Sequence, residues 1–222
     1  MTESLLIAID GPSGSGKSST SRGVAQRLGL AYLDTGSLYR AAAVCFLDSG
    51  LDAGQTDEII ELVTAARIDP GTDPASPSTV VNGRDVTDEI REPRVSEKVS
   101  TIATIPQVRA WLNEQFRSII EASGRRIVVE GRDITTVVAP DADLRILLVA
   151  DPAARIARRQ AELGDGVDAA QVTDQVVRRD RDDSTVSQFE KPAEGVELVD
   201  STYMNLDEVI DAICELVPGP RG

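Results

Sequence analysis

The stretch from Leu5 to Ser19, LLIAIDGPSGSGKSS, decides the fold of this chain. It opens with an apolar run typical of a buried strand and then matches the pattern GxxxxGK[ST] between Gly11 and Ser18. A helical pattern follows directly and stops at Gly29. Because a strand, a glycine-rich loop and a helix occur in the order that this pattern requires, the sequence predicts a phosphate-binding loop (P-loop) for a nucleoside triphosphate.

Each part of this loop has an expected task. Glycines let the backbone N–H groups turn toward phosphate oxygens, and the helix that follows adds the positive end of its dipole. Lys17 is expected to reach the β- and γ-phosphates of the nucleoside triphosphate, and the Ser18 hydroxyl suits the accompanying Mg²⁺. The triphosphate-binding residues predicted in the loop are Gly11, Pro12, Ser13, Gly14, Ser15, Gly16, Lys17, Ser18 and Ser19.

Strand and helix patterns alternate along most of the remaining chain. Helical patterns are predicted at 37–49 with a stop at Gly50, at 56–66, about 92–104, 106–122, from Pro152, at 167–183 and after Asn205 as the cap. Two apolar runs, at 125–131 and 144–151, are typical of parallel strands buried on both faces. A turn-rich segment near 70–90 interrupts the alternation and contains Asn82-Gly83, a hairpin signal. We therefore expect one α/β domain with a doubly wound, mainly parallel sheet, a small β-containing insert and a helical lid. Its approximate parts are a core (1–35, 105–150 and 190–222), an acceptor-binding region (36–104, with the β-rich insert at 70–90) and a lid (151–189).

Composition limits the function further. The net charge of −14 argues against binding to nucleic acid or to an anionic membrane, and the first apolar run is too short to span a bilayer. Cys45 and Cys214 lie far apart among apolar neighbours, which favours free thiols in a reducing cytoplasm. The chain has no histidine, so every mechanism that needs an imidazole is excluded. We expect a monomer.

Two arginine-bearing segments favour phosphoryl transfer to an acceptor that already carries a phosphate. DTGSLYR contains Arg40, and RRIVVEGRDI places Arg132 directly after a buried strand. Ligands of open α/β sheets bind beyond the carboxyl ends of the strands, so both guanidinium groups are expected at the acceptor phosphate. With Lys17 they are the predicted catalytic residues. The NKxD segment typical of GTPases is missing from the sequence.

Almost end to end, the chain resembles the bacterial cytidylate kinases of the nucleoside monophosphate kinase group. The motifs that carry the resemblance are IDGPSGSGKSS, LDTGSLYR, NGRDVTDEIR, VSTIATIPQVR, VVEGRDITTVV and RRDRDDST. The resemblance implies ATP-dependent phosphoryl transfer to CMP and dCMP, with Mg²⁺ as the cofactor of ATP. No strong base is needed, because the acceptor is already an anion.

The resemblance also implies roles for single residues. Ser100, Arg109 and Asp133 would face the cytosine, whose N4 amine can donate to the carboxylate while Arg109 donates to O2 or N3. Uracil presents a carbonyl where cytosine has the amine, and such a mismatch between buried polar groups discriminates strongly. The full set implied for the acceptor is Thr35, Arg40, Ser100, Arg109, Glu130, Arg132, Asp133, Arg179 and Asp183.

Within that set, Thr35 would lie near the base, and Arg179 and Asp183 near the pentose. Glu130 would hold a Mg²⁺-bound water or orient an arginine, at a position where the family more often has aspartate. Arg155, Arg158 and Arg159 would belong to a lid over the triphosphate, with a solvated helix face as the alternative for each.

The chain departs from the family pattern at Val186, where the family has an arginine that helps to bind the acceptor; Lys191 is the nearest substitute. Two further functions stay open: a kinase of broader specificity that includes UMP, and a P-loop protein that binds nucleotide without transferring phosphate. A kinase of unphosphorylated sugars or shikimate would need a base near a hydroxyl and would leave the cytosine set unexplained.

Two segments of the chain look alike, VVNGRDVTDEI from Val80 and VVEGRDITTVV from Val128. Only the second leaves a long buried strand, so only its Arg132 and Asp133 are expected in the site. Arg84 and Asp85 follow the Asn82-Gly83 turn and are interpreted as residues of the insert.

Overall fold

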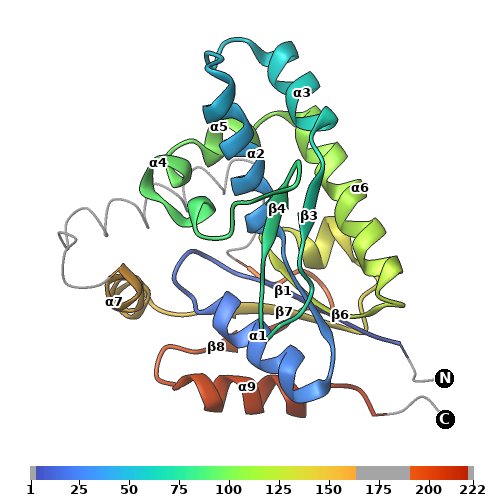
Figure 1. Cartoon of the computed structure of the whole chain (residues 1–222). Coiled ribbons are helices and arrows are strands. Elements are labelled where there is room, and N and C mark those ends of the chain that lie inside the picture. Colours follow the sequence, from blue (N-terminus) through green and yellow to red (C-terminus); the bar gives the residue numbers. More distant parts are fainter. Residues whose placement is uncertain (1–3, 164–190, 220–222) are drawn as a thin grey trace.

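The computed structural model describes residues 4–163 and 191–219, and its centre is a five-stranded parallel sheet (Figure 1). The strand order is β2-β6-β1-β7-β8, and each neighbouring pair runs parallel. This confirms the predicted doubly wound α/β fold. The strands are β1 (Leu5–Asp10), β2 (Ala31–Asp34), β6 (Arg126–Gly131), β7 (Leu144–Val149) and β8 (Glu197–Asp200).

Both faces of the sheet are buried, which explains why its central strands read as continuous apolar runs. In β1, Leu6 and Ala8 pack into the hydrophobic cluster that contains residues of the helices α2 (Thr35–Ser49) and α6 (Pro106–Ala122). Ile7 and Ile9, which point the other way, pack into the cluster that contains residues of α1 (Lys17–Leu28) and α9 (Leu206–Glu215). The P-loop therefore leaves the end of a strand that is held on both sides.

The main helices follow the predicted boundaries closely. The left-handed backbone of Gly29 (φ 63°) ends α1, and that of Gly50 (φ 71°) ends α2. Asn205 caps the N-terminus of α9 in a capping box with Glu208. The helices are α1 (Lys17–Leu28), α2 (Thr35–Ser49), α3 (Thr56–Ala65), α6 (Pro106–Ala122), α7 (Pro152–Leu163) and α9 (Leu206–Glu215). None of the helices in the described residues is both long and apolar enough to span a membrane.

The insert is a small antiparallel sheet of β3 (Ile68–Pro70), β4 (Thr79–Val81) and β5 (Arg84–Asp85). Asn82 (φ 50°) and Gly83 (φ 83°) form the turn between β4 and β5, as their sequence predicts. Arg84 forms ion pairs with Asp48 and Glu89, both at 2.5 Å. The first of the two look-alike segments is thus a hairpin, as expected.

The helical pattern predicted from about Glu92 to Thr104 does not form a single helix. The chain instead forms a 3₁₀ turn η1 (Glu89–Arg91) and two short helices, α4 (Pro93–Ser96) and α5 (Val99–Ala103). The N–H of Lys98 bonds to the carbonyl of Val95 in a tighter turn, which interrupts the helical ladder. The break lets Val95 and Ile102 both bury in the cluster around α2. The further helix predicted at 167–183 lies outside the described residues.

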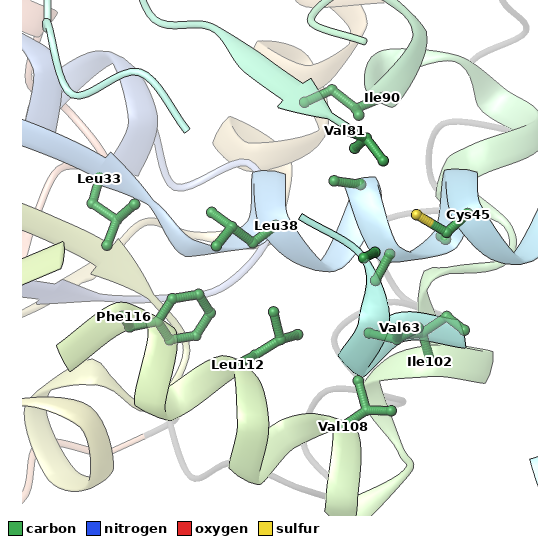
Figure 2. Close-up of a cluster of buried hydrophobic side chains, with 14 of the residues drawn as sticks. Leu33, Leu38, Cys45, Val63, Val81, Ile90, Ile102, Val108, Leu112 and Phe116 are labelled. Atoms are coloured by element: carbon green, nitrogen blue, oxygen red, sulfur yellow. The ribbon is translucent and has the colours of Figure 1, made fainter. Parts of the chain in front are cut away.

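The larger hydrophobic cluster joins the insert to the sheet. Figure 2 shows Leu33 of β2 and Phe116 of α6 in the same cluster as Val81 of β4. Cys45 of α2 is buried in this cluster, and both Cys45 and Cys214 are free thiols. The position of α2, which begins at Thr35, is therefore fixed from two sides.

Candidate active site

The carboxyl ends of three neighbouring strands bring three of the predicted segments together. In the parallel register, Asp10 of β1 lies beside Gly131 of β6, and Asp34 of β2 lies beside Glu130 of β6. The P-loop follows β1, the segment with Arg40 follows β2, and the segment with Arg132 follows β6. Three stretches far apart in the sequence thus meet at one edge of the sheet, where open α/β sheets bind ligands.

The P-loop has no room for a side chain at two of its three glycines, Gly11 and Gly14. A Cβ atom on Gly11 would lie 2.1 Å from the carbonyl oxygen of Leu148, and one on Gly14 would lie 2.7 Å from that of Arg155. Gly14 and Gly16 also have left-handed backbones, with φ of 73° and 89°. This close approach explains the spacing of glycines in the motif.

The Lys17 side chain folds back over this loop. Its Nζ donates a 2.9 Å hydrogen bond to the carbonyl oxygen of Pro12, so the ammonium lies against the loop backbone. Ser18 and Ser19, in the first turn of α1, are exposed. A cation beside a helix N-terminus that begins with two exposed serines is suited to a polyphosphate and its metal.

Glu130 is a buried carboxylate with several partners. The Tyr32 hydroxyl donates a 2.6 Å hydrogen bond to its Oε1, and Ser18 also forms a side-chain hydrogen bond to it. Burial raises the pKa of Glu130, and the nearby charge of Asp34 raises it further. The charge of Lys17 and the hydrogen bonds from Ser18 and Tyr32 have the opposite effect on this pKa.

The Ser18 hydroxyl and the Glu130 carboxylate form an oxygen donor pair of the kind that Mg²⁺ uses when phosphates and water supply its other ligands. The residues present therefore fit the predicted metal. Thr35 is less open: its buried hydroxyl donates to the Glu130 carbonyl oxygen at 2.7 Å.

The two arginines predicted at the acceptor phosphate are anchored at different strand ends. Arg40 Nη2 lies 3.3 Å from Asp34 Oδ2, and both side chains are less than one-fifth exposed. Asp34 also accepts a hydrogen bond from the N–H of Ser37 and so caps α2. Arg132 Nη1 donates to the carbonyl oxygen of Gly11, the first residue of the P-loop.

The pair predicted to face cytosine is preformed. Arg109 and Asp133 form an ion pair, and their side chains are 17% and 12% exposed. Arg109 also donates to the carbonyl oxygen of Ala103 at 3.2 Å, and its guanidinium lies over the ring of Tyr39 at 5.8 Å. Ser100, half-buried, lies in the same short helix α5 as Ala103. The three predicted base contacts are therefore positioned by adjoining elements.

Two of the arginines predicted in the lid contact the P-loop backbone. Arg155 Nη1 donates to the Ser13 carbonyl oxygen at 2.9 Å, and Arg158 Nη1 donates to that of Ser15 at 3.2 Å. Arg158 also bonds to the hydroxyl and carbonyl oxygens of Ser201, so it joins the end of β8 to the loop.

The other residues predicted for the site lie in the lid (151–189) or just after it. Arg159 is half-buried, and Lys191 is exposed. Arg179, Asp183 and Val186 lie outside the described residues, so their predicted places in the site stay predictions.

Sequence reasoning missed two residues of this region, Asp10 and Tyr32. Asp10 is 3% exposed and receives hydrogen bonds from the turn that follows Asp133. The signal for it was a carboxylate closing an apolar strand just before Gly11. The signal for Tyr32 was weaker, since a tyrosine within a buried strand is ordinary.

Comparison with known proteins identifies related sequences along nearly the whole chain. A family model described as cytidylate kinase matches residues 7–219. A "Cytidylate kinase" of Cutibacterium acnes (strain DSM 16379 / KPA171202) is 60% identical over 218 residues, which are 98% of this chain and 97% of that protein. A "Cytidylate kinase" of Streptomyces griseus subsp. griseus is 46% identical over 220 residues, covering 98% and 94% of the two chains. A solved structure of an uncharacterized protein from Eubacterium ventriosum covers 97% of this chain and 98% of its own, with a TM-score of 0.53 and 11% identity, which supports the fold alone.

Proposed function

The chain belongs to the cytidylate kinase family and is an ATP-dependent kinase that phosphorylates CMP and dCMP, and from this premise we propose which of its residues carry out the transfer. The observation that carries the proposal is the meeting of the P-loop, Arg40 and Arg132 at the ends of neighbouring strands. One loop would hold the donor triphosphate, and the two guanidinium groups would hold the acceptor phosphate opposite it.

The transfer in this proposal needs positioning and charge neutralisation only. Lys17 contacts the β- and γ-phosphates, and Arg132, bonded to Gly11 in the P-loop, lies between donor and acceptor. Arg40, held by Asp34, binds the acceptor phosphate from the other side. The acceptor oxygen is already anionic, so no residue has to remove a proton from it. Arg155, Arg158 and Arg159 complete the proposed ATP site from the lid.

Ser18 and Glu130 are the proposed holders of Mg²⁺, Ser18 through its hydroxyl and Glu130 through a bound water. The ion supplies charge neutralisation on the β- and γ-phosphates when it is bound. Tyr32 and Ser18 orient the Glu130 carboxylate through their hydrogen bonds.

Selectivity for cytosine is proposed to come from Asp133 and Arg109. Their ion pair places a carboxylate and a guanidinium side by side with little exposure to water. A base that binds there must therefore offer a donor to Asp133 and an acceptor to Arg109. Cytosine offers both, through N4 and through N3 or O2, whereas uracil opposes Asp133 with a carbonyl oxygen. Ser100 and Thr35 are proposed at the same base, and Arg179 and Asp183 at the pentose.

An acceptor panel tests the proposal. ADP release is measured with CMP, dCMP, UMP and AMP, for the wild type and for Asp133→Asn. The wild type should prefer the cytosine nucleotides, and the variant, whose amide can donate to uracil O4, should lower the ratio of kcat/KM for CMP over UMP by ~100-fold. Asp85→Asn, in the look-alike segment of the insert, is the matched control and should leave the ratio unchanged. Equal turnover of UMP and CMP by the wild type would contradict the cytosine assignment and favour a broader kinase.

We further propose that the enzyme is a cytoplasmic monomer that does not bind nucleic acid, with a core (1–35, 105–150 and 190–222), an acceptor-binding region (36–104) and a lid (151–189). The charge of −14 and the two free thiols support this proposal. Light scattering of the purified chain, with and without both substrates, tests the monomer.

A further inference from the structure

Asp10, the last residue of β1, holds the backbone turn that follows Asp133. Its carboxylate is 3% exposed and accepts hydrogen bonds from the N–H groups of Ile134 at 2.9 Å and Thr135 at 2.8 Å. The Thr135 hydroxyl donates a third bond at 2.6 Å. The carboxylate therefore binds the first N–H groups of the helical turn η2 (Ile134–Val138).

These bonds fix the backbone on the carboxyl side of Asp133. The Asp133 carbonyl oxygen, in turn, accepts a hydrogen bond from the N–H of Val137 at 2.9 Å. The peptide between Asp133 and Ile134 is thus bonded at both ends, to Asp10 and to Val137. The Asp133 side chain leaves a backbone that has little freedom to rotate, and its carboxylate meets Arg109.

The residue next to Asp10 holds the residue next to Asp133. The Gly11 carbonyl oxygen accepts a hydrogen bond from Arg132. Two adjacent residues at the end of β1 are therefore bonded to two adjacent parts of the segment after β6. The start of the P-loop and the proposed acceptor-binding segment are connected at two points, one of which is a buried charge.

A purely structural explanation makes a different prediction. A carboxylate that only satisfies N–H groups at the end of a helical turn would stabilise the fold and leave acceptor selectivity unchanged. Burial raises the pKa of Asp10, and the hydrogen bonds from Thr135 and Ile134 oppose that rise, so the three donors favour the charged form that accepts them. The two explanations differ in whether a variant of Asp10 changes the ratio of kcat/KM for CMP over UMP.

We propose that Asp10 is a positioning residue for acceptor selectivity, because its carboxylate sets the direction in which Asp133 presents its own carboxylate to the base. This inference rests on the proposed role of Asp133 at cytosine. Asp10 itself touches neither substrate in this proposal. It acts through the Ile134–Thr135 backbone.

The test compares kcat/KM for CMP and UMP, KM for ATP and the melting temperature in a set of variants. Asp10→Asn replaces an acceptor oxygen by a donor facing the Thr135 and Ile134 N–H groups, and it should lower the CMP-to-UMP ratio by ~10-fold. Thr135→Val, which loses only the hydroxyl bond, should lower the ratio by a smaller factor. Thr135→Ser keeps the hydroxyl and should keep the ratio of the wild type.

Ile9→Val is the matched control for stability, since Ile9 is fully buried and precedes Asp10 in the same strand. It should lower the melting temperature and leave the ratio unchanged. If Asp10→Asn does not fold, the Thr135→Val and Thr135→Ser pair decides by the same ratio.

Two negative results have different meanings. If Asp133→Asn shifts the ratio while Asp10→Asn and Thr135→Val lower the rates on CMP and UMP equally, the positioning role of Asp10 is overturned and the role of Asp133 stands. If Asp133→Asn itself leaves the ratio unchanged, the proposed cytosine contact fails and the inference about Asp10 fails with it.

Discussion

Tyr32 and Glu130 lie on the neighbouring strands β2 and β6, and the Tyr32 hydroxyl donates a 2.6 Å hydrogen bond to Glu130 Oε1. Both side chains are buried. Burial raises the pKa of Tyr32, so the phenol keeps its proton and remains a donor to the carboxylate. The proposed holder of the metal-bound water is thus oriented from inside the sheet.

Tyr32→Phe should therefore weaken the binding of the metal specifically. The change removes one oxygen atom and leaves the buried carboxylate short of one donor, which costs about 1–3 kcal/mol for a bond to a charged group. We expect the Mg²⁺ concentration for half-maximal rate to rise ~10-fold. KM for CMP should change little. Steady-state rates over a Mg²⁺ titration measure both.

Tyr203→Phe is the matched control, since Tyr203 is 95% exposed. The same deletion of a hydroxyl group there should leave the Mg²⁺ titration of the wild type unchanged. If Tyr32→Phe has the same Mg²⁺ titration as the wild type, the Tyr32 hydroxyl does not orient Glu130 for metal binding.

The raised pKa of Glu130 predicts how stability depends on pH. The folded-state pKa lies above the ordinary value of 4.5, so the protonated form favours folding below that value, and this contribution is lost as the pH rises through the folded-state pKa. Glu130→Gln stays uncharged at every pH and has no such loss. As the pH rises from 4.5, the free energy of unfolding of the Gln variant should therefore increase relative to that of the wild type. Urea unfolding between pH 4 and pH 8, a range of about 4 units, measures the difference.

Asp85 provides a comparison of opposite sign. Hydrogen bonds from Thr87 lower the pKa of Asp85, so its contribution to stability is present above the ordinary value and is lost as the pH falls through the lowered one. The free energy of unfolding of Asp85→Asn should therefore be lower than that of the wild type at neutral pH, and the difference should shrink in acid. A parallel pH course for both variants would contradict the assignment to Glu130.

Arg132→Ala should lower kcat/KM for CMP by ~10–100-fold, because a bond between a guanidinium and an anion is lost at the acceptor phosphate. The change also removes the bond from Arg132 to Gly11. KM for ATP should rise less than KM for CMP, since Lys17 and the loop backbone remain. Initial rates over both substrate concentrations separate the two constants.

Arg84→Ala in the look-alike segment is the control for this experiment. Arg84 has a half-exposed side chain in an ion-pair network with Asp48 and Glu89, so its loss should change stability by less than about 1 kcal/mol. Rates with CMP should be those of the wild type. An equal effect of the two changes on kcat/KM would contradict the assignment of only the second segment to the site.

The sequence predicted most of the helices and strands, but it did not predict which of them lie side by side. The P-loop, the hairpin at Asn82-Gly83 and the Asn205 cap depend on neighbouring residues, so local patterns were sufficient for them. The role of Asp10 depends on its contact with Thr135, and the role of Tyr32 depends on its contact with Glu130. Both contacts depend on the order of the strands in the sheet, which local sequence patterns do not determine. The register that joins such pairs became visible only in the fold.

The break between α4 and α5 shows the same limit inside one segment. The pattern from Glu92 to Thr104 is helical, and its apolar residues suit a helix. The backbone turns at Lys98 because Val95 and Ile102 both bury in the cluster around α2, so tertiary packing outweighed local propensity.

The contact between Gly23 of α1 and Ile210 of α9 predicts a compensating pair of substitutions. A Cβ atom on Gly23 would lie 2.2 Å from Ile210 Cδ1 and 2.9 Å from Ile210 Cγ1, and Ile210 is 5% exposed. Gly23→Ala gains about 1 kcal/mol of helix propensity, but overpacking at such a contact costs about 1–3 kcal/mol, so the single variant should be the less stable protein. Ile210→Val alone removes Cδ1 and costs about 0.5–1.5 kcal/mol.

In the double variant, the methyl group that Gly23→Ala adds enters the space that Cδ1 leaves. Ile210→Val should then stabilise the Gly23→Ala background, although it destabilises the wild type, and relief is partial because the position of Cγ1 remains close. Urea unfolding of the four proteins gives a coupling energy of about 1–3 kcal/mol with the compensating sign. Additive effects would show that the Ile210 side chain or α9 moves aside without cost in free energy, and that the packing at Gly23 does not constrain these helices.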